Sequence, residues 1–452
     1  MRAAAGMIAG DAPGGLERVE RAAQDVSARI GRAVVAGVAN LAGEDPPARA
    51  RCPAGHGARL AGARPKTIRT LLGRFVLVRG YYHCRECGAG FAPLDDRFGV
   101  ARTSLSPGLS RACALAGAEM PYQKAVAFIG EVTGLDLASA STLNRVTLRE
   151  GRRARAAMDA EAAAVSFRDA GPSWEPDPVL RPPDKCYVVM DGTGAPMLPA
   201  ETEGRAAKDG QRAGTREVKI ACLFTASGVD PATGEPVWDE GSASYVATFE
   251  ACGPFGHQAH REHRRRRLDA CRQPVVLGDG AKWIWGIAAE HFPDATEIVD
   301  YYHACEHVAD LARLVEPVLD DRAAWAHTLI GHLDAGDTQA IADAVCALHL
   351  PDTAPSLAGP AATETAYFTA NHHRMQYAHF KQKGYFTGSG AVESACNSLV
   401  KQRAKRAGMH WTIAGLDPVI ALRTLRQSHR DHLIWNTVPC QTTREPTPAS
   451  QS

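Results

Sequence analysis

Two aspartates of this chain each follow a short apolar run and precede a glycine. Asp191 comes after the apolar residues 187–190, and Asp279 comes after the apolar residues 275–277 and one glycine. Apolar runs of this length that close on an acid and a glycine are typical of buried strands that deliver a carboxylate to a sheet edge. Two such carboxylates brought together would hold a hard cation such as Mg²⁺, which prefers oxygen ligands. Taken singly, each Asp-Gly pair is explained equally well as a turn after a strand.

A third acid, Glu393, borders an apolar stripe with helical spacing. The stripe comprises Val392, Ala395, Cys396, Leu399 and Val400. Phosphodiester chemistry with two cations about 3.5–4 Å apart needs at least one acid beyond the two aspartates, and Glu393 is the best candidate. Ser389, flanked by two glycines, is the expected cap of this helix. An acid in the first turn is also explained by the helix dipole alone.

The elements that must position these acids follow one another in a recognisable order. From residue 184 onward the pattern predicts three strands, a basic helix, a fourth strand, a helix with two tryptophans, and a fifth strand. This order is expected of an RNase-H-like α/β fold with a mixed sheet, in which strands one and four are neighbours. Asp191 and Asp279 would then lie within reach of one cation. The predicted segments are 186–191, 216–225, 244–249, 261–272, 274–279 and 295–300.

Three of the twelve cysteines cluster near the N-terminus with one histidine. Cys52 and His56 form one short knuckle, Cys84 and Cys87 form another, and paired strands around Gly73 join them. This is the pattern of a zinc ribbon, in which four ligands close a tetrahedral structural Zn²⁺ site. His83 competes as a ligand, and a ribbon without metal is the alternative. The other nine cysteines are scattered singly and are expected to be core residues.

The remaining segments predict a multidomain chain with no membrane span. Hydrophobic residues make up 45% of the sequence, the formal net charge is +1, and no apolar stretch approaches the ~18–20 residues that a span needs. The apolar stretch after the first basic residue is too short for a signal peptide, so a cytoplasmic protein is expected. The predicted parts are an N-terminal helical segment (1–47), the ribbon-like module (48–100), a helical domain that is either helix-turn-helix-like or a plain linker (101–170), the catalytic core (184–305), a helical insertion (306–380), the catalytic and C-terminal helices (381–436) and a disordered tail (437–452).

Several motifs together resemble those of bacterial insertion-sequence DDE transposases of the ISKra type, within the Mutator-like group. The matching stretches are VVMDGT at 188–193, REVK at 216–219, LGDGAKWIW at 277–285, DYYHACEH at 300–307 and GSGAVES at 388–394. The resemblance covers most of the chain. It implies that Asp191, Asp279 and Glu393 are the catalytic acids that hold Mg²⁺ or Mn²⁺, with an all-helical insertion before the third. Glu306, the competing third acid, is better explained as a helix-surface residue.

Further residues follow from the resemblance and from their place beside the acids. Asp300 and His303 match a motif near the active site of the wider group and are expected to support the DNA end or the acids. Trp283 stacks a flipped base or belongs to the core, whereas Trp285 is expected in the core. A zinc pair from His303 and His307 is less expected than a helix with satisfied histidines. Phosphate contacts are expected from Lys401, Arg403, Lys405 and Arg406. A run of basic residues is also explained, more commonly, as a solvent-exposed helix face.

The implied reaction cuts the ends of an insertion sequence and joins the freed 3′-hydroxyls to target DNA. Its partners would be terminal inverted repeats and target DNA, recognised by the ribbon and the 101–170 helices. Two ends must be held together, so a homodimer or a higher assembly on DNA is expected. Two alternatives stay open, namely a structure-specific RNase-H-like nuclease and a catalytically silent, domesticated DNA-binding protein.

Overall fold

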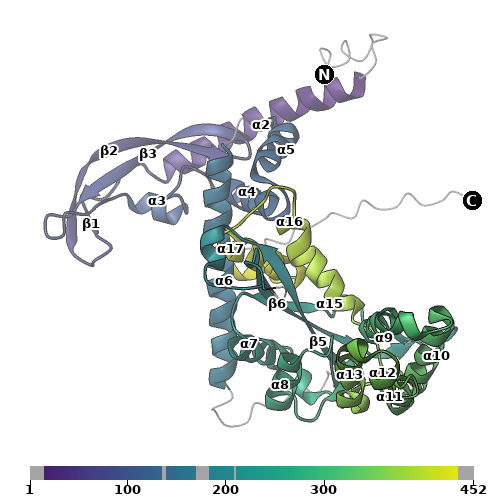
Figure 1. Cartoon of the computed structure of the whole chain (residues 1–452). Helices are drawn as coiled ribbons and strands as arrows, with labels where there is room; N and C mark the ends of the chain where they lie inside the picture. Colours follow the sequence, from purple (N-terminus) through teal and green to yellow (C-terminus); the bar gives the residue numbers. More distant parts are fainter. Residues whose placement is uncertain (1–14, 135–138, 169–182, 208–209, 436–452) are drawn as a thin grey trace, which may run out of the picture. The chain divides into compact units, whose positions relative to one another are not determined.

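The computed structural model describes residues 15–134, 139–168, 183–207 and 210–435 (Figure 1). The chain divides into two compact units, residues 1–150 and 151–452, and each is described by itself. The boundary falls inside a long helix, α6 (Ala140–Arg168), within the segment 101–170 that the sequence predicts as one domain. The predicted tail at 437–452 lies outside the described residues. Within them, no helix is long and apolar enough to cross a membrane.

The first unit contains a long helix and an antiparallel sheet. Helix α2 (Gly15–Leu41) confirms the predicted N-terminal helix and packs against β3. The sheet has the order β1-β2-β3-β4. Its hairpin turns at Gly73, as the sequence predicts, because φ is +108° there and few residues other than glycine tolerate that backbone. The strands are β1 (Arg49–Arg51), β2 (Gly57–Thr70), β3 (Gly73–His83) and β4 (Gly90–Phe91).

A small helical core completes the first unit. After the short α3 (Pro93–Arg97), α4 (Pro107–Glu119), α5 (Tyr122–Thr133) and the start of α6 bury one apolar cluster. Ser139 precedes the first residue of α6 and caps it, because its hydroxyl accepts the Thr142 N–H at 3.3 Å. Helices α4 and α6 approach closely at Gly117, where a Cβ would lie 2.2 Å from the Thr147 hydroxyl. The cluster comprises Leu105, Leu109, Cys113, Ala116, Ala125, Ile129, Leu143 and Val146.

The second unit is built on a five-stranded mixed sheet with the order β11-β10-β5-β6-β9. All five strands that the sequence predicts are present. The first predicted strand, β5, pairs in parallel with the fourth, β10, so the expected neighbourhood of these two strands is confirmed. β11 also pairs in parallel with β10. On the other side of β5, β6 pairs antiparallel with both β5 and β9. The strands are β5 (Lys185–Pro196), β6 (Thr215–Ala226), β9 (Ser244–Thr248), β10 (Gln273–Gly278) and β11 (Thr296–Val299), with a separate two-stranded sheet of β7 (Gly228–Val229) and β8 (Pro236–Val237).

Two predicted boundaries in this unit are wrong. β5 does not end at Asp191 but continues to Pro196, because β6 pairs with it along its whole length. Only the parallel pairing with β10 stops here, at Met190, one residue before Asp191. The basic helix predicted at 261–272 begins earlier, at Cys252, and ends at Arg265. The first turns of this helix carry few charges, so the basic run in the sequence indicated only the second half of the helix.

Helices cover the sheet and fill the predicted insertion. α7 (Cys252–Arg265) packs on α8 (Lys282–His291), and α9 (Tyr301–Val315) follows β11. In Figure 1, α9 to α13 gather as one helical group. A continuous helix made of α15, a π-helical turn and α16 then packs against β5 and β6, and α17 lies against β9. The remaining helices are α10 (Arg322–Ala335), α11 (Thr338–Cys346), α12 (Leu350–Thr353), α13 (Pro355–Ala370), α14 (Tyr377–Gln382), α15 (Gly390–Ala395), the π turn (Cys396–Lys401), α16 (Gln402–Ala404) and α17 (Ile413–Gln427).

Candidate functional site

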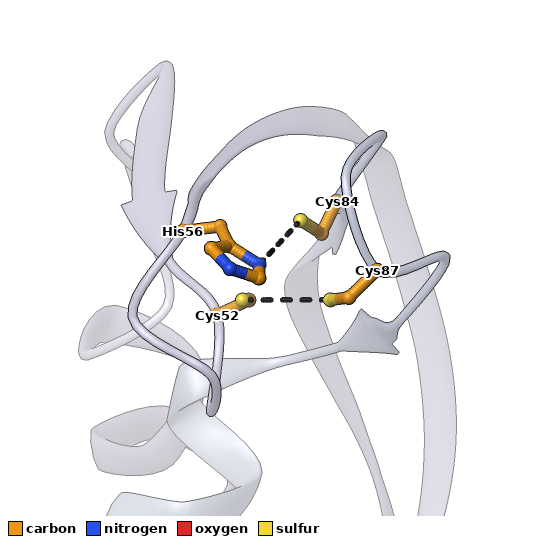
Figure 2. A group of neighbouring side chains, drawn as sticks. All are labelled: Cys52, His56, Cys84 and Cys87. Carbon is orange, nitrogen blue, oxygen red and sulfur yellow. Dashed lines mark hydrogen bonds between the residues drawn. The ribbon is translucent and has the colours of Figure 1, made fainter.

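The first unit brings the four predicted zinc ligands together at the open end of its sheet. Figure 2 shows the side chains of Cys52, His56, Cys84 and Cys87 converging from two loops. In the first loop the Cys52 N–H donates to the His56 carbonyl at 2.9 Å. In the second, the Cys84 N–H donates to the Ala89 carbonyl at 2.9 Å. Each loop therefore closes on itself and holds its two ligands in a fixed turn.

The distances between these ligand atoms fit one tetrahedral cation. The sulfur atoms of Cys52 and Cys87 lie 3.7 Å apart, and the Cys84 sulfur lies 3.9 Å from His56 Nδ1. Two thiolates bound to one Zn²⁺ at ~2.3 Å are separated by about 3.8 Å in a tetrahedron. The separation also exceeds the ~2.05 Å of a disulfide, so these cysteines are free thiols. His83, the competing ligand, is exposed and lies outside the group.

The electrostatics of the cluster also suit a metal ligand set. Backbone N–H groups, first that of Cys87, lower the pKa of the Cys84 thiol to about 7. The thiolate is the form that binds metal. Tyr82 stacks on Phe91 beneath the site, with ring centroids 5.6 Å apart, and donates its hydroxyl to the Pro47 carbonyl. The cluster thus joins β2, β3 and β4 at a small core, which is the role of a structural site.

In the second unit, three parallel strands deliver three acids to one edge of the sheet. The last parallel pairs are Gly278 with Met190 and Gly278 with Val299. The next residue along each of the three strands is Asp191, Asp279 or Asp300. Neighbouring strands lie about 4.8 Å apart, so the three backbone positions form a row. Asp191 and Asp279 thus follow two directly paired strands, and the charge of Asp279 acts on Asp191.

The Asp191 carboxylate is held by two donors and is partly buried. It accepts the Gly192 N–H at 2.6 Å and the Cys396 thiol at 3.2 Å. Burial raises its pKa, the neighbouring charge of Asp279 raises it further, and Lys401 opposes the rise. A carboxylate that burial and a like charge disfavour is the kind of group that a bound cation would relieve.

The raised pKa of Asp191 predicts a stability cost that depends on pH. Because the pKa is higher in the folded state, ionised Asp191 destabilises the fold fully above that value, and the cost vanishes below the unfolded value of about 3.9. Asp191→Asn removes the charge and keeps one amide oxygen for the Gly192 N–H, while its amide nitrogen replaces the oxygen that accepts the Cys396 thiol. We expect it to raise the melting temperature of the metal-free protein at pH 7 and to change nothing near pH 3. Equal melting temperatures at pH 7 would contradict this assignment.

The helical insertion contributes directly to the second acid. Asp279 accepts the Ala281 N–H at 2.9 Å, and the Tyr367 hydroxyl from α13 donates to its backbone carbonyl at 3.1 Å. At Gly280 φ is +94°, and a Cβ there would lie 2.7 Å from the Tyr367 ring. Glycine is therefore required twice, for the backbone conformation and for the ring. Tyr367 in turn stacks on His307 with ring centroids 3.8 Å apart.

Asp300 positions the helix that carries Glu393. Its side chain is buried, and one oxygen accepts the His303 N–H at 2.7 Å and so caps α9. The other oxygen accepts the backbone N–H of Ser389, which is the residue before α15. The Tyr301 N–H donates to the Thr387 carbonyl at 2.8 Å beside it. Ser389 is the N-cap as predicted, but its hydroxyl makes no cap bond, and Asp300 takes its N–H instead.

Removal of the Asp300 side chain is therefore expected to loosen two helices at once. Asp300→Ala leaves the first turn of α9 and the Ser389 N–H without their acceptor, which should cost about 3 kcal/mol of unfolding free energy. Asp310→Ala, an exposed acid of the same helix, is the matched control and should change stability little. Chemical denaturation compares the two variants. A stability loss of the same small size in both would show that Asp300 is not an anchor.

Glu393 lies in the first turn of α15, exposed, beside β5 and β6. The predicted apolar stripe from Val392 to Val400 is buried, as expected. One feature was not predicted, a π-helical turn at Cys396–Lys401 directly after α15. Such turns occur often at functional sites. Among the described residues, Asp191, Asp279 and Glu393 do not all bring carboxylate oxygens within 4.8 Å of one another.

The predicted DNA-contact residues divide into exposed and buried ones. Lys401, Lys405 and Arg406 are exposed. The predicted phosphate contact of Arg403 is wrong, because its side chain is 1% exposed and its guanidinium lies 4.8 Å over the Trp411 ring. Arg403 follows Leu399 by four residues and Val400 by three, so it continues the buried stripe of this helix. Its charge is therefore not presented to phosphate.

The aromatic and histidine predictions have mixed outcomes. Trp285 is buried as expected, with Arg374 over its ring at 4.4 Å. Trp283 is partly buried and meets Phe255 edge to face at 5.7 Å. His303 lies 3.2 Å from Glu306 and His307 lies 2.9 Å from Glu364, so both histidines have carboxylate partners.

Sequence reasoning missed three side chains around the acids. Cys396 looked like a scattered core cysteine, yet its thiol bonds the Asp191 carboxylate. Lys219 is 8% exposed and lies opposite Gly192 on β6, with Glu217 2.6 Å away. The motif at 216–219 was noted in the sequence, but it gave no role for either residue. Tyr367 had no local signal, because it reaches Asp279 from a distant helix.

Comparisons with known proteins add little to this geometry. No family model matches the chain, and no curated protein matches it. Among solved structures, the chain is similar to the Drosophila P element transposase strand transfer complex. That match has a TM-score of 0.24 and 9% sequence identity, and it covers 75% of this chain and 83% of the other. A TM-score this low establishes no shared fold.

Proposed function

We propose that the chain is a DDE-type DNA transposase that cuts the ends of an insertion sequence and joins their 3′-hydroxyls to target DNA. The observation that carries this proposal is the row of acids after three parallel strands, with the Glu393 helix packed against β5 and β6. The strand order, with the first and fourth strands paired in parallel and the next two antiparallel, supports an RNase-H-like core. The sequence motifs resemble those of the ISKra type at the same residues.

Asp191, Asp279 and Glu393 would hold Mg²⁺ or Mn²⁺. Their oxygen-only donor set suits a hard cation. The negative charge of Asp279 raises the pKa of Asp191, and this repulsion supports a cation at that place. When bound, two cations stabilise the attacking and leaving oxygens of an in-line displacement at phosphorus. The residues of the chain act around them. Asp300 fixes the start of α15, the Cys396 thiol and the Gly192 N–H orient Asp191, and Tyr367 fixes the turn after Asp279.

DNA recognition is assigned to surfaces outside the acids. Lys401, Lys405 and Arg406 are exposed on the helix that follows Glu393 and would contact phosphates. Trp283 is assigned to the DNA end near Asp279. The zinc-ribbon module and the helices α4 to α6 would read the terminal inverted repeats. Two ends must be cut together, so the active form is proposed to be a dimer or a higher assembly on DNA.

The experiment that tests the proposal uses the gene in its own surroundings. A supercoiled plasmid carries the coding sequence with its native flanking DNA, and purified protein is added with Mg²⁺, with Mn²⁺ or with EDTA. We expect metal-dependent nicks at two fixed flanking positions, and joined products when target DNA is present. Nicks without fixed positions would favour a structure-specific nuclease. Binding without any metal-dependent cleavage would favour a silent DNA-binding protein, and either result overturns the transposase.

A further inference from the structure

A second group of metal-ligating side chains lies outside the row of acids. His257 on α7 faces Glu290 and His291 at the C-terminal end of α8. One ligand atom from each residue lies within 4.8 Å of the other two. The rings of His257 and His291 are 4.8 Å apart between centroids, at an interplanar angle of 62°. The group links two consecutive α-helices that are separated by β10 and packed on each other.

His291 is the least satisfied member of this group. Its side chain is 7% exposed, and its Nε2 is buried without a hydrogen-bond partner. The nearest carboxylate oxygen, from Glu290, is 3.7 Å away. Helix α7 makes room for the ring at Gly256, where a Cβ would lie 3.0 Å from the imidazole. A buried, unpaired ring nitrogen costs free energy, which a ligand bound to that nitrogen would recover.

We propose that His257, Glu290 and His291 form a second transition-metal site, which takes Zn²⁺. Two imidazoles and one carboxylate are an established zinc donor set, and a fourth position is left for water or another ligand. The ring of His260, one turn along α7, stacks on His291 at 5.3 Å and is the nearest further imidazole. The site differs chemically from the thiolate cluster of the first unit and from the oxygen-only row of acids.

The position of the site indicates what the ion would do. Helix α8 begins three residues after Asp279 and ends at His291, so it connects the turn after that acid to the proposed site. A cation shared by α7 and the end of α8 would tie that helix to its neighbour. We therefore assign the site a bracing role, in which the metal stabilises the second unit and takes no part in phosphoryl transfer.

Zinc stoichiometry tests this proposal. Full-length wild type, His257→Gln, His291→Gln and His327→Gln are dialysed to equilibrium against the same Zn²⁺ concentration and analysed for bound zinc. His327 is an exposed histidine of α10 that belongs to neither metal cluster. We expect His257→Gln and His291→Gln to bind one zinc fewer per chain than wild type and His327→Gln. The first-unit cysteines are identical in all four proteins, so the difference does not depend on whether that site holds metal.

Thermal unfolding gives an independent readout of the same site. Without zinc, His257→Gln, a substitution of an exposed residue, should have the same melting temperature as wild type. This result would exclude a folding defect. Added Zn²⁺ should raise the melting temperature of the second unit in wild type and in His327→Gln, but not in His257→Gln. Wild-type zinc content in both cluster variants would overturn the proposal. An equal loss in His327→Gln would also overturn it, because it would identify adventitious binding by surface histidines.

Discussion

Replacement of Asp279 by Asn is expected to reduce DNA cleavage and joining by at least about a thousandfold, without loss of the fold. The side chain keeps its size and still accepts the Ala281 N–H, and the Tyr367 hydroxyl bonds the backbone carbonyl, which the substitution leaves unchanged. What is lost is one of the negative charges that would hold the cations. The like charge next to Asp191 also disappears, so the metal-free variant should be at least as stable as wild type.

The matched control for this variant is Asp294→Asn. Asp294 is an exposed acid just before β11, at the end of the strand opposite to Asp300. It should leave both activity and stability unchanged. Rates are measured on the plasmid with the native flanking DNA, and stability by thermal unfolding with and without Mg²⁺. Full activity of Asp279→Asn would remove this aspartate from the site.

The second large effect is expected at the cysteine cluster. Cys84→Ser should lose the metal of the first unit and open the end of the sheet, because the two loops meet at these ligands and at the small core around Tyr82. Structural zinc contributes about 10–16 kcal/mol in zinc-finger peptides, so the module should unfold locally. Hydrogen exchange should rise in β1, β4 and the adjoining ends of β2 and β3. The second unit should keep its protection.

Cobalt substitution separates this site from any other in the chain. Thiolate ligands give Co²⁺ an intense charge-transfer absorption that imidazole and carboxylate ligands do not. Wild type should show it, Cys84→Ser should not, and Cys346→Ser, which removes an exposed thiol of α11, should match wild type. A wild type without this absorption would identify the cluster as a ribbon that has lost its metal.

Local sequence patterns predicted the strands, their order and the ligand cluster. Apolar runs at 187–190 and 275–277 located β5 and β10, since buried strands of a parallel pair exclude polar residues along their length. The spacing of Cys52, His56, Cys84 and Cys87 predicted a convergence that depends on two short loops and one hairpin. These features are encoded within a few residues of each other, so the sequence displays them.

The errors and omissions concern interactions between distant parts of the chain. β5 continues past Asp191 because β6 pairs with it, which no property of residues 191–196 reveals. The basic run at 401–406 placed Arg403 among the phosphate contacts, whereas in the fold it is buried beneath Trp411 and continues the apolar stripe. The contacts of Cys396 with Asp191 and of Tyr367 with Asp279 join residues 205 and 88 positions apart. Asp300 was expected near the acids, but its link to Ser389 required the fold.

The central claim is that Glu393 completes the site with Asp191 and Asp279, and strand transfer tests it most directly. The assay joins a labelled, precut end of the element to target DNA in Mg²⁺, with wild type, Glu393→Gln and Glu306→Gln compared at equal DNA binding. Glu306 is an exposed acid of α9 and the competing candidate. We expect joining by wild type and Glu306→Gln, and at least about a thousandfold less by Glu393→Gln. Equal joining by wild type and Glu393→Gln, or loss with Glu306→Gln instead, would contradict the account.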